Sequence, residues 1–125
     1  MSQLNESNIL DCFYQITGVN SEEFTQYSVI SNARQYVESR LVSDELTDEQ
    51  VEQCEYAAAV YGAYEYILAR NGAEKIVISQ SGRAVSSQSD ADAVSAVSEL
   101  KRAVFGSLKD LIDENRFSFI ATGGE

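Results

Sequence analysis

The residue types that usually carry enzymatic or metal chemistry are sparse in this chain. There is no histidine, which removes the commonest general base and metal ligand. Cys12 and Cys54 lie far apart in the sequence and do not provide a zinc quartet. Both fall on apolar faces of predicted helices, so we interpret them as reduced, buried thiols and not as a disulfide framework. We expect no bound metal and no cofactor.

One acid-rich segment, "SDELTDEQVEQCE" (residues 43–55), has enough carboxylates to suggest a calcium site. It lacks the alternating Asp or Asn residues and the central glycine of an EF-hand loop. Thr47 followed by Gln50 instead matches a capping box, with acidic residues in the first helical turn. We therefore interpret the segment as the start of a helix.

Serines and tyrosines give no clearer catalytic signal. "SQSGR" (residues 79–83) places a serine before a glycine, but it is not the G-x-S-x-G nucleophile elbow and has no histidine partner. Tyrosines are dense in one predicted helix, at positions Tyr56, Tyr61, Tyr64 and Tyr66. Such spacing favours core or interface residues over a ligand-stacking box. We predict a protein that is not an enzyme.

The charge of the chain argues against two classes of partner. The 125 residues carry a net charge of -11, with twenty acidic against nine basic residues, whereas nucleic-acid binders cluster Lys and Arg. Such a surface repels DNA and anionic lipid. No apolar run approaches the roughly 18–20 residues that span a bilayer. The N-terminus lacks the pattern of a secretory signal. We expect no membrane partner and synthesis in the cytoplasm.

The spacing of apolar residues predicts a mainly α fold, a small bundle of about four helices in one domain over residues 1–125. The first helix lies in "NESNILDCFYQITG" (residues 5–18), with Asn5 or Ser7 as its N-cap and Gly18 as its end.

Three more helices follow in the predicted order. The second begins at Asn20 or Ser21 and runs to about Arg40. The third covers "SDELTDEQVEQCEYAAAVYGAYEYILARNG" (residues 43–72) and is the spine of the fold, because it is apolar around much of its surface. Its main stripe is predicted to be Val51, Cys54, Ala57, Tyr61, Tyr64 and Leu68. The fourth is capped by Ser89 or Asp90 and runs to about Glu114.

Two segments break the helical pattern. Residues 74–87 read as an inserted β-hairpin, and residues 116–125 as a strand-like C-terminal tail. A lone hairpin is marginal in water unless something packs on it. Either the tail adds a third strand or a neighbouring subunit covers the apolar face, so we expect surfaces made for assembly. The alternative for the tail is that it folds back onto the hairpin or the helices of its own subunit. The candidate subunit-contact residues of the hairpin are Ile76, Ile78, Arg83 and Val85, and the candidate docking residues of the tail are Arg116, Phe117, Phe119 and Ile120.

The order of these elements resembles small head-to-tail connector, or adaptor, proteins of tailed bacteriophages and prophages. The likeness is carried by the central "CEYAAAVYGAYEYILAR", by the glycine-containing strand pair and by a last helix ending in "RFSFIA". "NARQYVESRL" is similar to the second-helix pattern of that family, in which A-x-x-x-V-E precedes a short acidic loop. The hairpin is longer than in the smallest adaptors, and residues 1–18 do not align.

The resemblance implies a virion protein at the head–tail junction, made in the host cytoplasm. Its subunits would form a ring, often twelve-fold, between the portal protein and a tail or stopper protein, with the C-terminal segment docked on the portal. DNA would only pass through the ring, and an acidic inner wall would let it slide. A closed ring needs two different complementary patches on each subunit. The hairpin would supply one of them.

Other classes remain open. A small acidic helical regulator, such as an inhibitor or anti-repressor, would bind another protein through the tyrosine-rich helix. It would be a monomer or dimer with the hairpin packed on its own subunit. A DNA-mimic inhibitor would need carboxylates spaced like phosphates, whereas the acidic residues here gather at helix starts.

Overall fold

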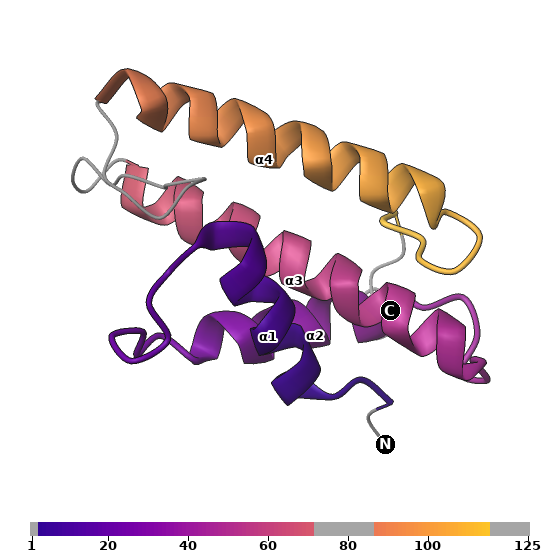
Figure 1. Ribbon diagram of the computed structural model, residues 1–125. Coiled ribbons are helices and arrows are strands. Elements are labelled where there is room, and N and C mark those ends of the chain that lie inside the picture. Colours follow the sequence, from indigo (N-terminus) through magenta and orange to yellow (C-terminus); the bar gives the residue numbers. More distant parts are fainter. Residues whose placement is uncertain (1–2, 72–86, 116–125) are drawn as a thin grey trace, which may run out of the picture.

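The computed structural model describes residues 3–71 and 87–115, and these residues are mainly helical (Figure 1). The helices are α1 (Glu6–Thr17), α2 (Ser28–Glu38), α3 (Asp48–Asn71) and α4 (Ser87–Ser107). Helix α3 lies between two layers: α4 runs antiparallel along one side of it, and α1 and α2 pack on the other side. Within the described residues, the predicted mainly α fold with four helices is confirmed.

Local capping signals set two of the helix starts. The Asn5 side chain accepts hydrogen bonds from the N–H groups of Ser7 (2.8 Å) and Asn8 (3.2 Å), so Asn5 is the N-cap of α1. Gly18 ends the helix with φ 74°, in the left-handed region that glycine adopts without strain. At α3 the predicted capping box is present: Thr47 Oγ1 accepts from the Gln50 N–H, and Gln50 Oε1 accepts from the Thr47 N–H.

Helix α3 is buried around most of its circumference, which confirms its predicted central position. Small residues make this burial possible because they let neighbouring helices approach closely. A Cβ added at Gly62 would lie 3.4 Å from Ala33 Cβ in α2 and 3.7 Å from Phe13 Cδ1 in α1. The buried residues of α3 are Cys54, Glu55, Ala57, Ala58, Ala59, Val60, Gly62, Ala63, Tyr66 and Ile67.

The α1–α2 side of α3 holds an aromatic cluster. The Phe13 ring lies 5.0 Å from Phe24 and 5.5 Å from Tyr66, centroid to centroid. Tyr14 and Tyr27 each meet Phe24 edge to face at its outer side. Edge-to-face aromatic contacts add to the stabilisation that comes from burying the rings.

The predicted start of the second helix was wrong. Asn20 begins only a single turn, in which its side chain accepts from the Glu22 N–H and its carbonyl from the Phe24 N–H. The chain then leaves the helical path, and α2 begins at Ser28. Phe24 is 4% exposed against Phe13, so burial of this ring in the tertiary core outweighs the local capping preference.

The predicted end of the fourth helix and one stripe position were also wrong. Helix α4 ends at Ser107, and the chain turns so that Ile112 forms an isolated antiparallel bridge with Leu41. Leu68, predicted to lie on the main stripe, is 39% exposed. The stripe prediction placed too much of the core on large residues, whereas alanines such as Ala58 and Ala63 occupy it.

The predicted hairpin and tail fall almost wholly outside the described residues. Residue 87, predicted to end the hairpin, is the first residue of α4. The structure contains no strand in the ranges 3–71 and 87–115, and the Leu41–Ile112 bridge is the β pairing that these ranges show.

Candidate functional site

The predicted contact residues Ile76, Ile78, Arg83 and Val85 of the hairpin, and Arg116, Phe117, Phe119 and Ile120 of the tail, lie outside the described residues. What the structure does describe is the place from which the tail departs. That place lies beyond the end of α4 and borders a hollow in the surface.

The chain after α4 is fastened to the loop between α2 and α3. The Val42 N–H donates to the Leu111 carbonyl (2.9 Å), and the Asp113 N–H donates to the Arg40 carbonyl (2.8 Å). Between them Ile112, 2% exposed, pairs with Leu41. We call residues 40–42 and 111–114, with the side chains that brace them, the C-terminal clasp. It holds residue 115 at a defined position.

An aromatic stack of α2 and α3 residues packs against the clasp. The Tyr36 and Tyr61 rings are nearly parallel (8°) with centroids 3.8 Å apart, and the Arg40 guanidinium lies 3.8 Å from the Tyr36 centroid. Burial, followed by the nearby Glu114 carboxylate, raises the pKa of Tyr36 to about 12. Burial, followed by Glu65, raises the pKa of Tyr61 to about 12. Both phenols therefore stay neutral at physiological pH.

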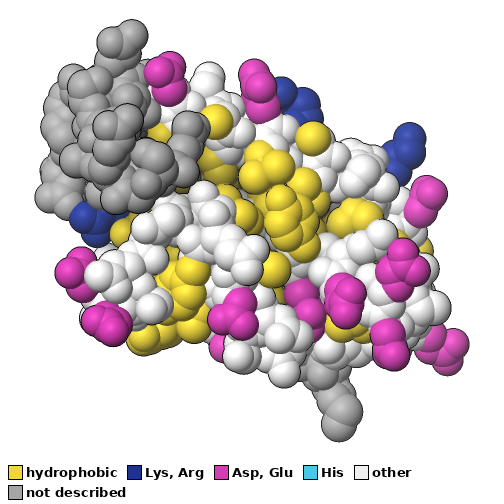
Figure 2. Space-filling model, viewed as in Figure 1, with side chains coloured by type: hydrophobic (Ala, Val, Ile, Leu, Met, Phe, Trp, Pro, Cys, Tyr) yellow, Lys and Arg dark blue, Asp and Glu magenta, His cyan; other side chains and the backbone are white. Residues whose placement is uncertain are grey.

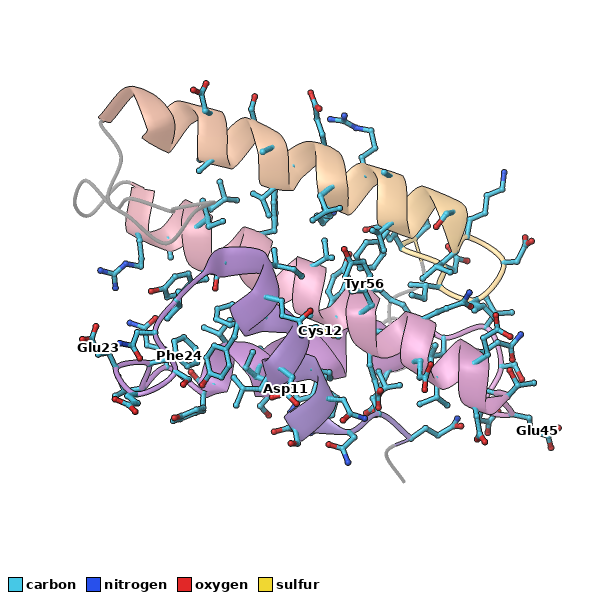
Figure 3. All side chains as sticks on the ribbon, viewed as in Figure 1. Asp11, Cys12, Glu23, Phe24, Glu45 and Tyr56 are labelled. Carbon is cyan, nitrogen blue, oxygen red and sulfur yellow. The ribbon has the colours of Figure 1, made fainter. Side chains whose placement is uncertain are left out.

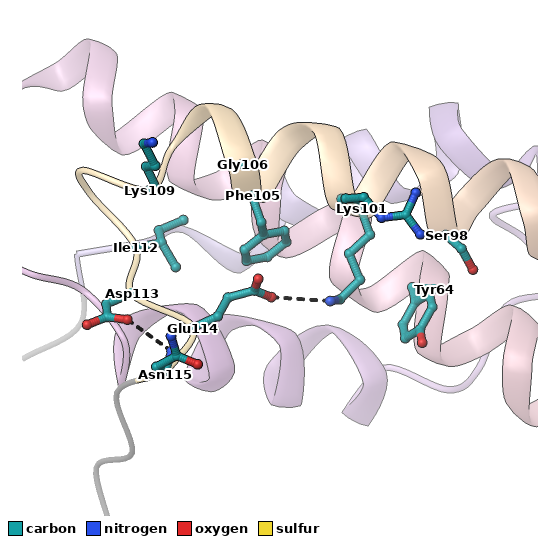
Figure 4. Close-up of a pocket in the computed structure, with 11 residues that line it drawn as sticks. Tyr64, Ser98, Lys101, Phe105, Gly106, Lys109, Ile112, Asp113, Glu114 and Asn115 are labelled. Carbon is teal, nitrogen blue, oxygen red and sulfur yellow. Dashed lines mark hydrogen bonds and ion pairs between the residues drawn. The ribbon is translucent and has the colours of Figure 1, made fainter.

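Glu114 links the stack to α4. Its Oε2 atom accepts from the Tyr36 hydroxyl (3.1 Å) and pairs with Lys101 Nζ (3.2 Å) (Figure 4). The Lys101 ammonium also lies 5.2 Å from the Tyr64 ring centroid and 5.4 Å from that of Phe105. Three segments distant in the sequence are thus joined at one carboxylate.

A hollow of about 550 Å³ opens beside these groups (Figure 4). Its lining carries three cations, Lys101, Arg102 and Lys109, and two carboxylates, one of which is the paired Glu114. Arg102 and Lys109 are exposed. In a chain with nine basic residues and a net charge of -11, this is a local concentration of positive charge. We call the exposed positions Arg102, Gly106 and Lys109 the basic stripe.

A second hollow, of about 460 Å³, lies between the first half of α3 and the end of α4. We call it the acidic groove; it is lined by Glu49, Glu52, Gln53, Tyr56, Val104, Ser107 and Leu108. In Figure 3, Tyr56 lies on the near side of the α3–α4 pair. In Figure 4, α4 runs in the direction opposite to that in Figure 3, so the molecule is seen there from its other side. The first hollow therefore opens on the opposite side of the α3–α4 pair from the acidic groove.

The cysteines and the buried carboxylate serve the fold. Burial and Glu55 raise the pKa of Cys54 to about 11, and burial and Asp11 raise the pKa of Cys12. The two thiols are unbridged; Cys54 is buried as predicted, and Cys12 is half-buried. Glu55, 4% exposed, accepts hydrogen bonds from the Asn5 N–H (2.7 Å) and from Asn8 Nδ2 (3.1 Å), so it ties α3 to the start of α1.

No group of three or more His, Cys, Asp or Glu residues suited to a metal ion occurs in the described part of the chain. Among its described helices, none has the length and apolar character to cross a membrane. On the face seen in Figure 2, acidic side chains are scattered over the surface, and hydrophobic side chains gather where α3 and α4 meet.

Sequence reasoning missed the clasp. A local signal for part of it was present, because Arg40 follows Tyr36 by only four residues, in the turn just after α2, and its guanidinium lies over the Tyr36 ring. No local signal pointed to Tyr61 or Glu114, which reach Tyr36 only through the tertiary fold.

Comparisons of the chain with protein-family models, with curated proteins and with solved structures gave no match.

Proposed function

We propose that this chain is a ring-forming structural protein of a tailed-phage virion, a connector between the portal vertex and the tail that performs no catalysis. The observation that carries the proposal is the C-terminal clasp. It fixes residue 115 by backbone hydrogen bonds and by the Glu114 contacts, so the next residues start from a defined point on the subunit. A segment meant to reach a partner gains affinity when its base is held in place.

The tail has the composition of such an anchor. Phe117 and Phe119 alternate with Ser118, which in an extended segment puts both rings on one side. Two aromatic anchors that enter a groove or extend a sheet edge of the portal supply most of the binding energy of a small contact. The hairpin of residues 74–87 provides a further contact, to the neighbouring subunit. A tail or stopper protein docks on the opposite end of the ring.

The charge of the chain suits the same role. Twenty acidic residues against nine basic ones give a surface that repels phosphate, so DNA passes through the ring without adhering.

The test separates docking from folding. In phage that carries Phe117→Ser with Phe119→Ser, we expect the purified subunit to melt at nearly the wild-type temperature, but particles to lack tails and the subunit to bind the portal at least about tenfold more weakly. Ser118→Ala is the matched control and should assemble normally. A sharp fall in melting temperature in the double variant would show that the tail belongs to the subunit's own core, and unchanged particles would rule out the docking role.

A second candidate is a small acidic regulator that binds another protein through the tyrosine-rich helix. The observation that favours it is Tyr56, which is 39% exposed in the acidic groove of α3. This reading predicts a monomer or dimer that forms no ring with or without the portal. Tyr56→Ala would then abolish capture of the regulated protein, whereas the tail substitutions would leave capture unchanged.

A further inference from the structure

Helix α4 presents two chemically opposite surfaces. The basic stripe and the α4 residues of the acidic groove lie on opposite sides of the helix, because a helix turns once every 3.6 residues, about 100° per residue. Within α4, positions 102 and 106 therefore point to the side opposite positions 104 and 107, and Leu108 and Lys109 lie in the turn that follows the helix. Any contact between the stripe of one copy and the groove of another leaves the first copy's groove and the second copy's stripe open.

The two surfaces are opposite in charge. The stripe carries two exposed cations, Arg102 and Lys109, and the groove carries two exposed carboxylates, Glu49 and Glu52. Between the cations lies Gly106, where an added Cβ would meet nothing within 4 Å. A helix without a side chain at that point can bring its backbone close to a groove wall. The groove offers Tyr56, Val104 and Leu108 as apolar contacts.

We propose that the basic stripe of one subunit docks in the acidic groove of the next copy of this chain, and that this heterologous contact closes the ring. The inference rests on the proposed connector function for the ring itself, and it names the residues that join neighbouring subunits. The occupant is a second copy because both complementary surfaces lie on one chain, which is what head-to-tail association requires.

The overall charge opposes association, so a local contact between opposite charges lowers that cost. Two copies at -11 each repel one another at a distance. At an ionic strength of about 0.15 M the Debye length is about 8 Å, so the long-range repulsion is screened while paired charges in contact are screened much less. A site where opposite charges meet therefore favours the association of two copies.

Charge reversal on each surface, followed by mixing, tests the contact. The stripe variant is Arg102→Glu with Lys109→Glu, and the groove variant is Glu49→Lys with Glu52→Lys. Each variant carries like charges on both of its surfaces and should lose self-association by at least about tenfold. An equimolar mixture should regain it, because every stripe–groove pair between the two variants is again of opposite charge.

The readouts are sedimentation velocity and electron microscopy of the chain, alone and with the portal of the same phage. The chain is used at about 1 mM, a concentration at which association with a millimolar Kd is still detected. Carbodiimide treatment of mixed light and heavy-isotope chains should join Lys109 of one copy to Glu49 or Glu52 of another. Glu22→Lys with Glu23→Lys, in the α1–α2 loop, is the control for charge change alone. Glu49→Gln with Glu52→Gln is the milder groove variant, for use if the lysines in the first turn of α3 unfold it.

The outcomes separate the contact from the function. Rings that form equally well in the reversed variants, or a mixture that does not assemble, would overturn the stripe–groove contact and leave the connector function standing. Assembly through this contact in a chain that neither binds the portal nor enters particles would overturn the connector function and leave the contact standing. Absence of wild-type association both alone and with the portal would overturn both.

Discussion

The two sides of α3 are built differently. On the α1–α2 side, interlocked aromatic rings surround Phe13, and Gly62 lets the helices approach so closely that an added Cβ would touch Ala33. On the α4 side, Gly106 faces open space, and hollows open on either flank of the α3–α4 pair. The first side holds the fold together. The second side attaches α4 and leaves charged surfaces exposed on it.

The C-terminal clasp fixes the end of the described chain although the flanks of α4 are open. Helix α4 packs along α3, and beyond its end the Leu41–Ile112 bridge and Glu114 bind the chain to α2 and the following loop. The last described residues are therefore fixed. Stability measurements on matched substitutions can separate the densely packed side from the open one.

The largest effect is expected at Phe13. Phe13→Ala removes a fully buried ring from the aromatic cluster and should lower the free energy of unfolding by about 3–5 kcal/mol. Leu68→Ala, at a position that is 39% exposed, should cost less than about 1 kcal/mol. Chemical denaturation of both variants gives the comparison. Equal losses would mean that the packing of α3 is misassigned.

The next largest effect on stability is expected at the buried carboxylate of Glu55. Glu55→Ala leaves the Asn5 N–H without its carboxylate acceptor and should destabilise the chain by about 1–3 kcal/mol. Glu52→Ala is the matched control one turn away on the exposed side of α3, and should change stability by less than about 0.5 kcal/mol. If Glu55→Ala is as mild as its control, the tie between α3 and α1 contributes nothing to stability.

The two helical glycines test packing density directly. Gly62→Leu should destabilise by about 1–3 kcal/mol, because the added atoms collide with α1 and α2. Gly106→Leu should instead stabilise by about 0.5–1 kcal/mol, through the higher helix propensity of leucine where space is open. Thermal unfolding of the two variants at equal concentration measures the contrast. A loss of stability at Gly106 would show that α4 is covered within the subunit.

The smallest effect on stability is expected in the clasp at alkaline pH. The pKa of Tyr36 is raised in the folded chain to about 12, against about 10 in an unfolded one. Its contribution to stability is therefore complete below pH about 10 and is lost as the pH rises through about 12. Tyr36→Phe also removes the hydrogen bond to Glu114, at a cost of about 0.5–1.5 kcal/mol near neutral pH.

Melting curves from pH 9 to 12 check this point, with Tyr56→Phe as the control because Tyr56 is 39% exposed and lies in the acidic groove, outside the clasp. The stability difference between wild type and Tyr36→Phe should narrow across this range. A difference that stays constant would mean that the Tyr36 hydroxyl is not held in the clasp.

The sequence predicted correctly those helix ends that are set by interactions between neighbouring residues. The Asn5 cap, the Gly18 end and the Thr47–Gln50 capping box all depend on neighbours within a few residues, and all three are present in the structure. The start of α2 and the end of α4 depend instead on where Phe24 and Ile112 are buried. Periodicity alone does not contain that information.

The candidate site was less predictable than the fold. The hairpin and tail residues predicted for it lie outside the described ranges and stay predictions. The clasp was missed because Tyr36, Tyr61 and Glu114 come from three segments that meet only after folding. The charges of α4 were visible in the sequence. Only the structure shows that the hollow beside Lys109 and the groove beside Glu52 open on opposite flanks.

The proposed function requires that this chain assemble into a ring at the portal. Electron microscopy of the purified chain at high concentration, alone and mixed with the portal protein of the same phage, tests it most directly. We predict closed rings of uniform subunit number, at the least in the presence of the portal, since a connector subunit that is monomeric alone can still assemble on its partner. Particles of monomer or dimer size in both samples would contradict the account.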